Sequence, residues 1–251
     1  AGATLEMALE SVIAQDSDCE WEAVVVNDGS ADNTYDVCQA YAARDDRIKI
    51  FTQANRGTGA ALNEAAHHAT GEFLVQLGAD DLLDSAYMRK TNALIKTHPT
   101  YDVYASNALR LYESGETSPC LKGGFFKKKR EITFEDLIWS NKIYGTAAIR
   151  RTLFWRVGGF QAGFYNEDYD LWLRLLIEGA QACFQPEYLA FYRVTQGQKT
   201  ENTIKVRRGD IAILQSLLKT RKLSEKQRIL IKLSCKQLQL KIVLKKMLGK
   251  R

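Results

Sequence analysis

The stretch that decides the fold is Val24-Val25-Val26-Asn27-Asp28-Gly29-Ser30. Three β-branched apolar residues in a row are typical of a buried strand, and the turn after them contains a glycine, which tolerates positive φ. Apolar residues recur at helical spacing before this strand, over residues 4–15, and after it, over residues 32–43. The order helix, strand, helix places Asp28 at the carboxyl end of the strand.

The same alternation continues to residue 81. Short strands are predicted at residues 48–51 and 73–77, with an alanine-rich helix at residues 59–69 between them. The second strand ends in Gly78-Ala79-Asp80-Asp81. This alternation predicts an α/β fold with a mostly parallel sheet and helices on both faces.

The second half of the chain has a different pattern. Residues 112–131 are rich in Ser and Gly and predict a long loop. Order resumes with helices near residues 134–139 and from Asp168, and the end of the chain reads as helical with apolar residues among lysines. We therefore predict a domain of residues 1–204 and a basic amphipathic helical tail of residues 205–251.

Composition and charge restrict the class of protein. The 251 residues are 45% hydrophobic, the five cysteines include no C-x-x-C pair, and no apolar run approaches the length of a spanning helix. We expect a globular chain without a signal peptide, a disulfide or a cysteine zinc site. Residues 205–251 hold 15 Lys or Arg and 2 acids. Such a tail can lie on an anionic bilayer, pack on the body or pair with another chain. No nucleic-acid motif accompanies it.

Two predicted strands end in acids, and ligands of parallel sheets bind beyond the carboxyl ends of the strands. Asp28 can accept a hydrogen bond from a nucleobase or a ribose; the alternative is a plain Asn-Asp-Gly hairpin turn. Asp80 and Asp81 are hard ligands suited to Mg²⁺ or Mn²⁺ held together with phosphates. The alternative for them is a helix N-cap before residues 82–87.

Two more segments lie where chemistry is possible. Glu167 and Asp168 open a helix, where acids favour the dipole, but a carboxylate that faces the sheet edge can act as a general base. Asn55-Arg56-Gly57 lies between a strand and a helix, so it can meet an anionic group or be a plain connecting loop. The residue types alone leave both pairs of alternatives open.

Five motifs follow one another in the order of a known family. They are Val24-Val25-Val26-Asn27-Asp28-Gly29-Ser30, Asn55-Arg56-Gly57 with Asn63, Thr70-Gly71-Glu72-Phe73 leading to Gly78-Ala79-Asp80-Asp81, Val157-Gly158-Gly159-Phe160, and Glu167-Asp168-Tyr169-Asp170-Leu171-Trp172-Leu173-Arg174. Over residues 2–200 this set resembles the family 2 glycosyltransferases of GT-A fold. Each motif alone is weak, but the five together make the resemblance specific.

The resemblance implies an inverting transferase that moves a sugar from a nucleotide diphosphate donor, usually a UDP-sugar, to a hydroxyl. By position, it implies that Asp28 contacts the uracil and that Asp80 is the metal-binding last Asp of a D-x-D motif, with Asp81 as second candidate. Asp168 would be the base that activates the acceptor, with Glu167 beside it. The implied cofactor is Mn²⁺ or Mg²⁺. The other expected donor-binding residues are Asn27, Asn55, Arg56 and Arg193.

Three features depart from the family pattern. The family's first strand, an apolar run that ends in Pro-x-Tyr-Asn, should precede Leu5, so we expect either a truncated sequence or a donor site that has lost this part. Gly78 stands at the first Asp of D-x-D, which weakens the metal site. Thr195 stands where a histidine often occurs, so Arg193 or Lys199 is expected to neutralise the diphosphate.

The resemblance implies a cytoplasmic enzyme at the inner face of the cell membrane that assembles a surface polysaccharide on a glycan or lipid-linked acceptor. The departures favour an alternative, a degenerate relative that binds a nucleotide or a partner without transferring sugar. A nucleotidyltransferase is a third hypothesis, but residues 1–15 lack the glycine-rich pyrophosphate loop that it needs.

Overall fold

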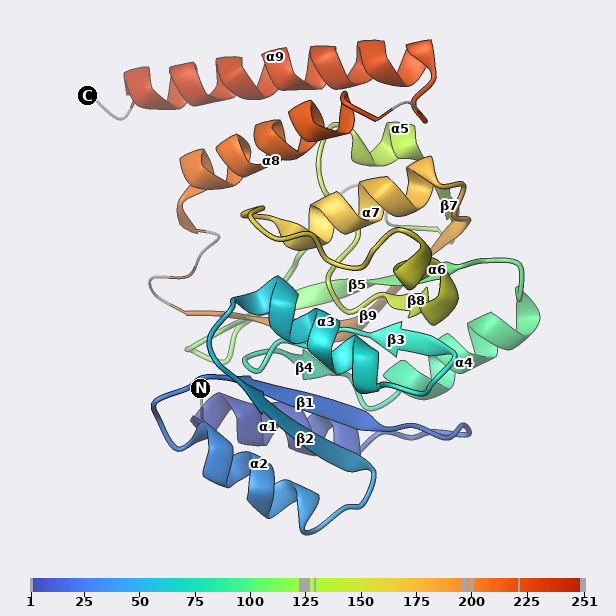
Figure 1. The fold of residues 1–251 in the computed structure, drawn as a ribbon, viewed down its shortest axis with the longest axis vertical. Helices are drawn as coiled ribbons and strands as arrows, with labels where there is room; N and C mark the ends of the chain where they lie inside the picture. Colours follow the sequence, from blue (N-terminus) through green and yellow to red (C-terminus); the bar gives the residue numbers. More distant parts are fainter. Residues whose placement is uncertain are drawn as a thin grey trace.

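The computed structural model describes residues 2–121, 127–128, 130–195, 198, 201–220 and 222–248. Figure 1 shows how its helices and strands are arranged. In chain order they are α1 (Gly2–Ile13), β1 (Ala23–Asp28), α2 (Thr34–Ala42), β2 (Ile48–Gln53), α3 (Thr58–His68), β3 (Phe73–Val75), β4 (Leu82–Leu83), α4 (Tyr87–Thr97), β5 (Val103–Tyr112), β6 (Thr117–Pro119), β7 (Arg130–Ile132), α5 (Phe134–Leu137), β8 (Ala148–Arg150), α6 (Arg151–Arg156), α7 (Glu167–Ile177), β9 (Ala182–Val194), α8 (Thr203–Leu217) and α9 (Glu225–Leu248).

The first two strands form a small layer of their own. β1 and β2 pair in parallel as a two-stranded sheet, with α1 and α2 on one face and α3 on the other (Figure 1). Successive side chains of a strand point to opposite faces, and Phe51 accordingly stacks on His68 of α3 at 3.6 Å. The opposite face buries Leu5, Leu9, Val37, Cys38, Tyr41 and Ile48. The predicted order of helix, strand, helix is confirmed.

The larger sheet has the strand order β3-β8-β5-β9-β4, with β6 paired to β5 and β7 paired to β9. Within it β5 and β9 are parallel, whereas its other pairings are antiparallel. The α/β class is therefore confirmed, but the prediction of a mostly parallel sheet is wrong for this part. Antiparallel strands can be joined by a tight turn, while parallel strands need a crossover, and β5 returns to β6 through a turn in which Gly115 has φ 83°.

The predicted loop at residues 112–131 also needs correction. Its first part contains β6, which pairs with β5, and its last residues belong to β7, which pairs with β9. Residues 122–126 and 129 lie outside the described part of the chain. The Ser and Gly content of this stretch concealed two short strands, because strands of three residues are too short to show an alternating pattern.

The helical tail packs against the body. Ser234 of α9 donates its hydroxyl hydrogen to the carbonyl of Ile138 at 2.6 Å, and Lys226 pairs with Glu135 at 2.9 Å. Side chains of α8 and of the turn and helix after it join the main core, among them Ile213, Leu214, Leu217, Leu223, Ile231, Cys235 and Leu238. These contacts show that one face of α8 and α9 packs on the body. The domain boundary at residue 204 stays a prediction. Every helix in the described ranges is too short or too polar to cross a membrane.

Candidate active site

Asp28 lies at the end of β1 and fixes the start of α3. Its carboxylate accepts hydrogen bonds from the backbone N–H of Arg56 at 2.9 Å and of Gly57 at 2.8 Å, and from the side chain of Gln53 at 2.7 Å. Burial acts to raise the pKa of Asp28, but these hydrogen bonds outweigh it and lower the pKa below its ordinary value. Because β1 and β2 are parallel and separated by α2, the hairpin alternative for Asp28 is excluded.

The predicted neighbours of Asp28 lie beside it in different ways. The Asn27 side chain is buried and accepts from the N–H of Ser30 at 3.0 Å, so it holds the turn. A Cβ on Gly29 would lie 2.9 Å from the backbone nitrogen of Asn55, so the turn and the loop before α3 touch. The Arg56 guanidinium is exposed and donates to Gln53 at 2.6 Å. It also pairs with the carboxylate of Glu64 at 3.6 Å, and its side chain is 59% exposed, so an anion can reach it.

Asp80 and Asp81 follow β3 and are joined to β9. The carboxylate of Asp81 accepts from the N–H of Arg193 at 3.0 Å and from the hydroxyl of Tyr144 at 2.9 Å. The Arg193 guanidinium donates to the carbonyl of Asp80 at 2.9 Å. Burial and the charge of Asp80 raise the pKa of Asp81 to about 7. A short strand, Leu82–Leu83, follows these acids, so their alternative role as a helix N-cap is excluded.

Gly78 lets the two carboxylates approach each other. A Cβ at this position would lie 2.8 Å from Oδ1 of Asp80 and 3.2 Å from Oδ2 of Asp81, so both oxygens face one small space above the glycine. The described residues contain no group of three His, Cys, Asp or Glu side chains that could hold a metal. Two carboxylates nevertheless fit Mg²⁺ or Mn²⁺, because these ions commonly take one or two carboxylates and complete their shell with substrate phosphates.

Asp168 lies in the first turn of α7, as the sequence predicted, and Glu167 begins this helix. Asn141 donates its amide hydrogen to Oδ2 of Asp168 at 2.9 Å. A Cβ on Gly59 would lie 4.0 Å from Cβ of Glu167, so α7 begins beside the first turn of α3. The acids of α7 and the loop that Asp28 holds therefore belong to one region of the molecule.

The rest of the α7 motif is structural. Asp170 is 2% exposed and pairs with Arg174 at 2.7 Å. Arg174 also donates to the carbonyls of Val157 and Gly159, at 2.7 and 2.8 Å. Gly159 has φ 62°, which favours glycine. These contacts account for the two-glycine motif and the Asp-Arg spacing without any part in chemistry.

Residues 141–144 connect the two groups of acids. Asn141 contacts Asp168, and Tyr144, three residues further on, contacts Asp81. Three residues span at most about 11 Å, so the candidate base and one candidate metal ligand contact nearby residues of one short loop. Sequence reasoning missed both residues, because the segment has neither an acid pair nor a glycine-rich pattern to mark it. The predicted Lys199 lies outside the described residues.

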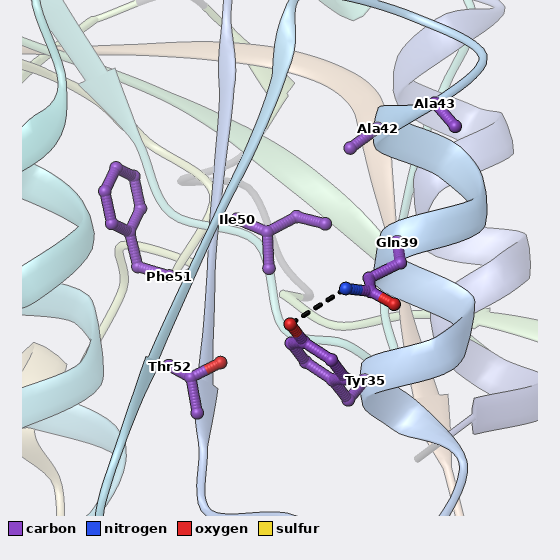
Figure 2. A pocket seen from close by; sticks show the side chains of 7 residues that line it. All are labelled: Tyr35, Gln39, Ala42, Ala43, Ile50, Phe51 and Thr52. Atoms are coloured by element: carbon purple, nitrogen blue, oxygen red, sulfur yellow. Dashed lines mark hydrogen bonds between the residues drawn. The ribbon is translucent and has the colours of Figure 1, made fainter.

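A wide cleft of about 780 Å³ lies elsewhere, between α2 and β2 (Figure 2). Figure 2 shows the hydrogen bond within it, from Gln39 to the Tyr35 hydroxyl at 2.9 Å. Its lining residues are Tyr35, Gln39, Ala42, Ala43, Ile50, Phe51 and Thr52. None of these is a candidate for catalysis or metal binding, so the cleft is no part of the candidate active site.

The chain is similar in sequence and in fold to known glycosyltransferases. The chain is 28% identical over 203 residues to the putative teichuronic acid biosynthesis glycosyltransferase TuaG of Bacillus subtilis, covering 79% of this chain and 77% of TuaG. Its fold matches S. aureus TarS 1-349 in complex with UDP-GlcNAc, with a TM-score of 0.74, 20% identity, and 90% of this chain and 66% of TarS 1-349 covered.

A second fold match is the mannosyltransferase PcManGT from Pyrobaculum calidifontis in complex with GDP-Man and Mn²⁺. Its TM-score is 0.70 at 20% identity, covering 94% of this chain and 66% of that one. The chain thus spans about two thirds of the length of both structures. The family model Glycosyl transferase family 2 matches residues 1–158. Since that is more than half of the chain, this protein belongs to glycosyl transferase family 2 and has the GT-A fold.

Proposed function

We propose that the chain is an inverting glycosyltransferase that moves a sugar from a UDP-sugar to a hydroxyl of a glycan or lipid-linked acceptor in surface polysaccharide assembly. The loop of residues 141–144 is the observation that carries this proposal, because Asn141 contacts Asp168 and Tyr144, three residues later, contacts Asp81. Support for the donor comes from the UDP-GlcNAc bound by TarS, and support for the setting from the name of TuaG.

The donor is bound between the two acidic regions. Asp28, with Asn27, Asn55 and Arg56 around it, contacts the uridine, and Asp80 and Asp81 hold Mn²⁺ or Mg²⁺ together with the diphosphate. The metal ion supplies positive charge that stabilises the departing diphosphate. Arg193, whose guanidinium lies against the Asp80 backbone, adds a second positive charge on the same side.

Asp168 accepts the proton of the attacking hydroxyl, and Glu167 lies beside it to orient the acceptor. A carboxylate suits this role because it needs only to lie within hydrogen-bond reach of the hydroxyl as the bond to the sugar forms. Attack from the side opposite the diphosphate inverts the anomeric carbon in one step, and no residue forms a covalent intermediate.

Calorimetric titration with UDP, with and without Mn²⁺, and release of UDP from UDP-GlcNAc test this proposal together. Asp168→Asn should lower turnover by about 10²- to 10⁴-fold and leave UDP affinity within about twofold of wild type. Asp46→Asn, a change of an exposed acid, is the control. Equal loss of binding and turnover in Asp168→Asn would contradict its role as base. Binding without turnover in wild type would instead support the degenerate relative.

We also propose that the protein acts in the cytoplasm, at the inner face of the membrane, through the outer side of α9. Seven apolar side chains of this helix are at least 48% exposed: Ile229, Leu233, Leu240, Val243, Leu244, Met247 and Leu248. Lysines lie among them, and only one acid, Glu225, is present in the helix. An anionic lipid surface complements both features, whereas a second copy would oppose lysine to lysine.

Sedimentation with vesicles tests this contact. Binding to phosphatidylglycerol vesicles and none to phosphatidylcholine vesicles is expected, and Leu240→Gln with Met247→Gln should reduce it by at least about tenfold, since two buried apolar side chains are lost. Tyr35→Gln, which changes an exposed aromatic side chain of α2, should leave binding unchanged. Equal binding to both kinds of vesicle, or to neither, would contradict the proposal.

A further inference from the structure

The residue before α7 does not cap its own helix. Asn166 occupies the N-cap position, where an asparagine side chain usually accepts a hydrogen bond from the first turn, but it makes no such bond. Its amide instead donates to the carbonyl of Val206 at 3.0 Å and to the carboxylate of Asp210 at 2.6 Å, both in α8. The first turn of α7 is therefore fastened to α8.

Helix α8 approaches this turn as closely as its backbone allows. Gly209 is buried in the middle of α8, and a Cβ there would lie 2.9 Å from Cβ of Tyr165 and 3.2 Å from Nδ2 of Asn166. Glycine weakens a helix by about 1 kcal/mol relative to alanine, but only glycine permits this contact. The approach and the two hydrogen bonds are independent signs that α8 holds the start of α7.

Asn141 holds the same turn from the other side. Its Oδ1 accepts from the N–H of Ile143 at 3.1 Å, which fixes the orientation of the amide and directs Nδ2 to Asp168. The amide group is therefore held in the orientation in which Nδ2 donates to the carboxylate of Asp168.

We propose that Asn141 and Asp210 are positioning residues for the reaction, which together hold Asp168 in place: Asn141 directly, and Asp210 through Asn166. This inference rests on the proposed function, because Asp168 is its base. It also gives the helical tail a part in catalysis, since α8 carries Asp210 and α9 packs against α8. The Arg207 side chain of α8 donates to the carbonyl of Lys241 in α9 at 3.1 Å, so α9 in turn contacts the helix that carries Asp210.

Several charged groups surround Asp168 and enter any titration of it. Glu167 and Asp170 lie on the same helix, and Asp170 is paired with Arg174. Asp210 faces it from α8. Burial, and after it the charge of Asp168, raises the pKa of Asp210 to about 6, while the hydrogen bond from Asn166 and the charge of Arg207 act to lower it. The amide of Asn141 donates to the ionised form of Asp168 and therefore favours that form.

Two substitutions test the proposal, with two readouts. Asn141→Ala should lower the turnover of UDP-GlcNAc about tenfold with an unchanged KM, because the base is less well placed. The loss of this hydrogen bond to the ionised form should also raise the pKa of Asp168, which carbon NMR of the carboxyl group measures. Asp210→Ala should lower turnover similarly, while Asp210→Asn, which keeps an oxygen for Asn166, should restore most of it.

Asn92→Ala is the matched control. It removes an amide-to-carboxylate bond of the same kind, from Asn92 to Asp18 at 2.6 Å, on the surface, and should change neither readout. An unchanged pKa of Asp168 in Asn141→Ala, or equal losses in Asp210→Asn and Asp210→Ala, would overturn the proposal. If wild type releases no nucleotide from UDP- or GDP-sugars, the proposed function fails. The pKa of Asp168 in Asn141→Ala then decides the positioning role alone.

Discussion

The end of β1 and the turn between β3 and β4 each present a carboxylate, and the surroundings shift the pKa values of the two in opposite directions. Asp28 receives two backbone N–H groups and a side-chain amide, and its pKa is lowered. Asp81 also accepts two hydrogen bonds, but it is more deeply enclosed and stands next to Asp80, and its pKa is raised to about 7. Hydrogen bonds outweigh burial at Asp28, whereas at Asp81 the hydrogen bonds and the charge of Arg193 do not outweigh burial and the charge of Asp80.

The opposite pKa shifts of Asp28 and Asp81 indicate that the two carboxylates suit different ligands. A carboxylate that the backbone already satisfies forms a fixed hydrogen-bond acceptor, suited to a neutral group such as a nucleobase. A carboxylate whose ionisation the fold disfavours becomes stable when a cation arrives.

The largest expected effect is the loss of metal-dependent binding. Asp80→Ala should reduce by about 100-fold the UDP affinity measured with Mn²⁺, because one of two carboxylates over Gly78 is gone. Without Mn²⁺ the variant and wild type should bind UDP alike. Asp46→Ala serves as the control in the same calorimetric titration. If Asp80→Ala binds like wild type with Mn²⁺, the metal contacts Asp81 alone or is absent.

The second prediction concerns pH. Since Asp81 is protonated below a pKa of about 7, the gain in UDP affinity from Mn²⁺ should fall by up to about tenfold for each pH unit below 7. UDP binding without metal provides the baseline at each pH. Asp81→Asn should remove this dependence along with the gain. A gain that is constant between pH 5.5 and 8 would show that Asp81 does not bind the ion.

The two regions also differ in how far sequence could predict them. Asp28 ends β1 and Asp168 lies in the first turn of α7, as periodicity predicted, whereas the strand predicted at residues 73–77 before Asp80 ends at Val75. The roles of these acids rest on the resemblance. Asn141 and Tyr144 lie in an irregular loop and act through contacts with residues 27 and 63 positions away in sequence. No local pattern marks such a contact.

The directions of the later strands could not be predicted for a related reason. Strand direction depends on which strands become neighbours, and β5 lies between β8 and β9, far from both in sequence. Likewise Gly209 resembles any glycine in a helix until α8 is placed against Asn166. Periodicity describes one element at a time, and these features depend on two.

The third prediction compares stabilities of the metal-free protein. The folded state favours the protonated form of Asp81, so its contribution to the free energy of unfolding falls as pH rises from about 4 to about 7. Asp81→Asn should therefore be more stable than wild type by about 1–2 kcal/mol at pH 8, a value kept small by partial exposure, and by less at pH 5. Urea unfolding of both proteins, with Asp46→Asn as the control, measures this. If Asp81→Asn were less stable than wild type at pH 8, the inference that the fold disfavours the ionised form of Asp81 would be contradicted.

Asp28 should give the smallest effect, with the opposite sign. Its lowered pKa means that its contribution to stability is complete above the unfolded value near 3.9 and is lost as pH falls through the folded value. Asp28→Asn should thus be less stable than wild type by about 0.5–1 kcal/mol at pH 7, because an amide oxygen replaces a carboxylate facing two N–H groups. The difference should close as the solution is acidified below pH 4 in the same urea experiment. If instead both Asp28→Asn and Asp81→Asn gained stability relative to wild type as pH rises, the pKa values of Asp28 and Asp81 would be shifted in the same direction. The assignment of the nucleoside to Asp28 and of the metal to Asp81 would then lose its physical basis.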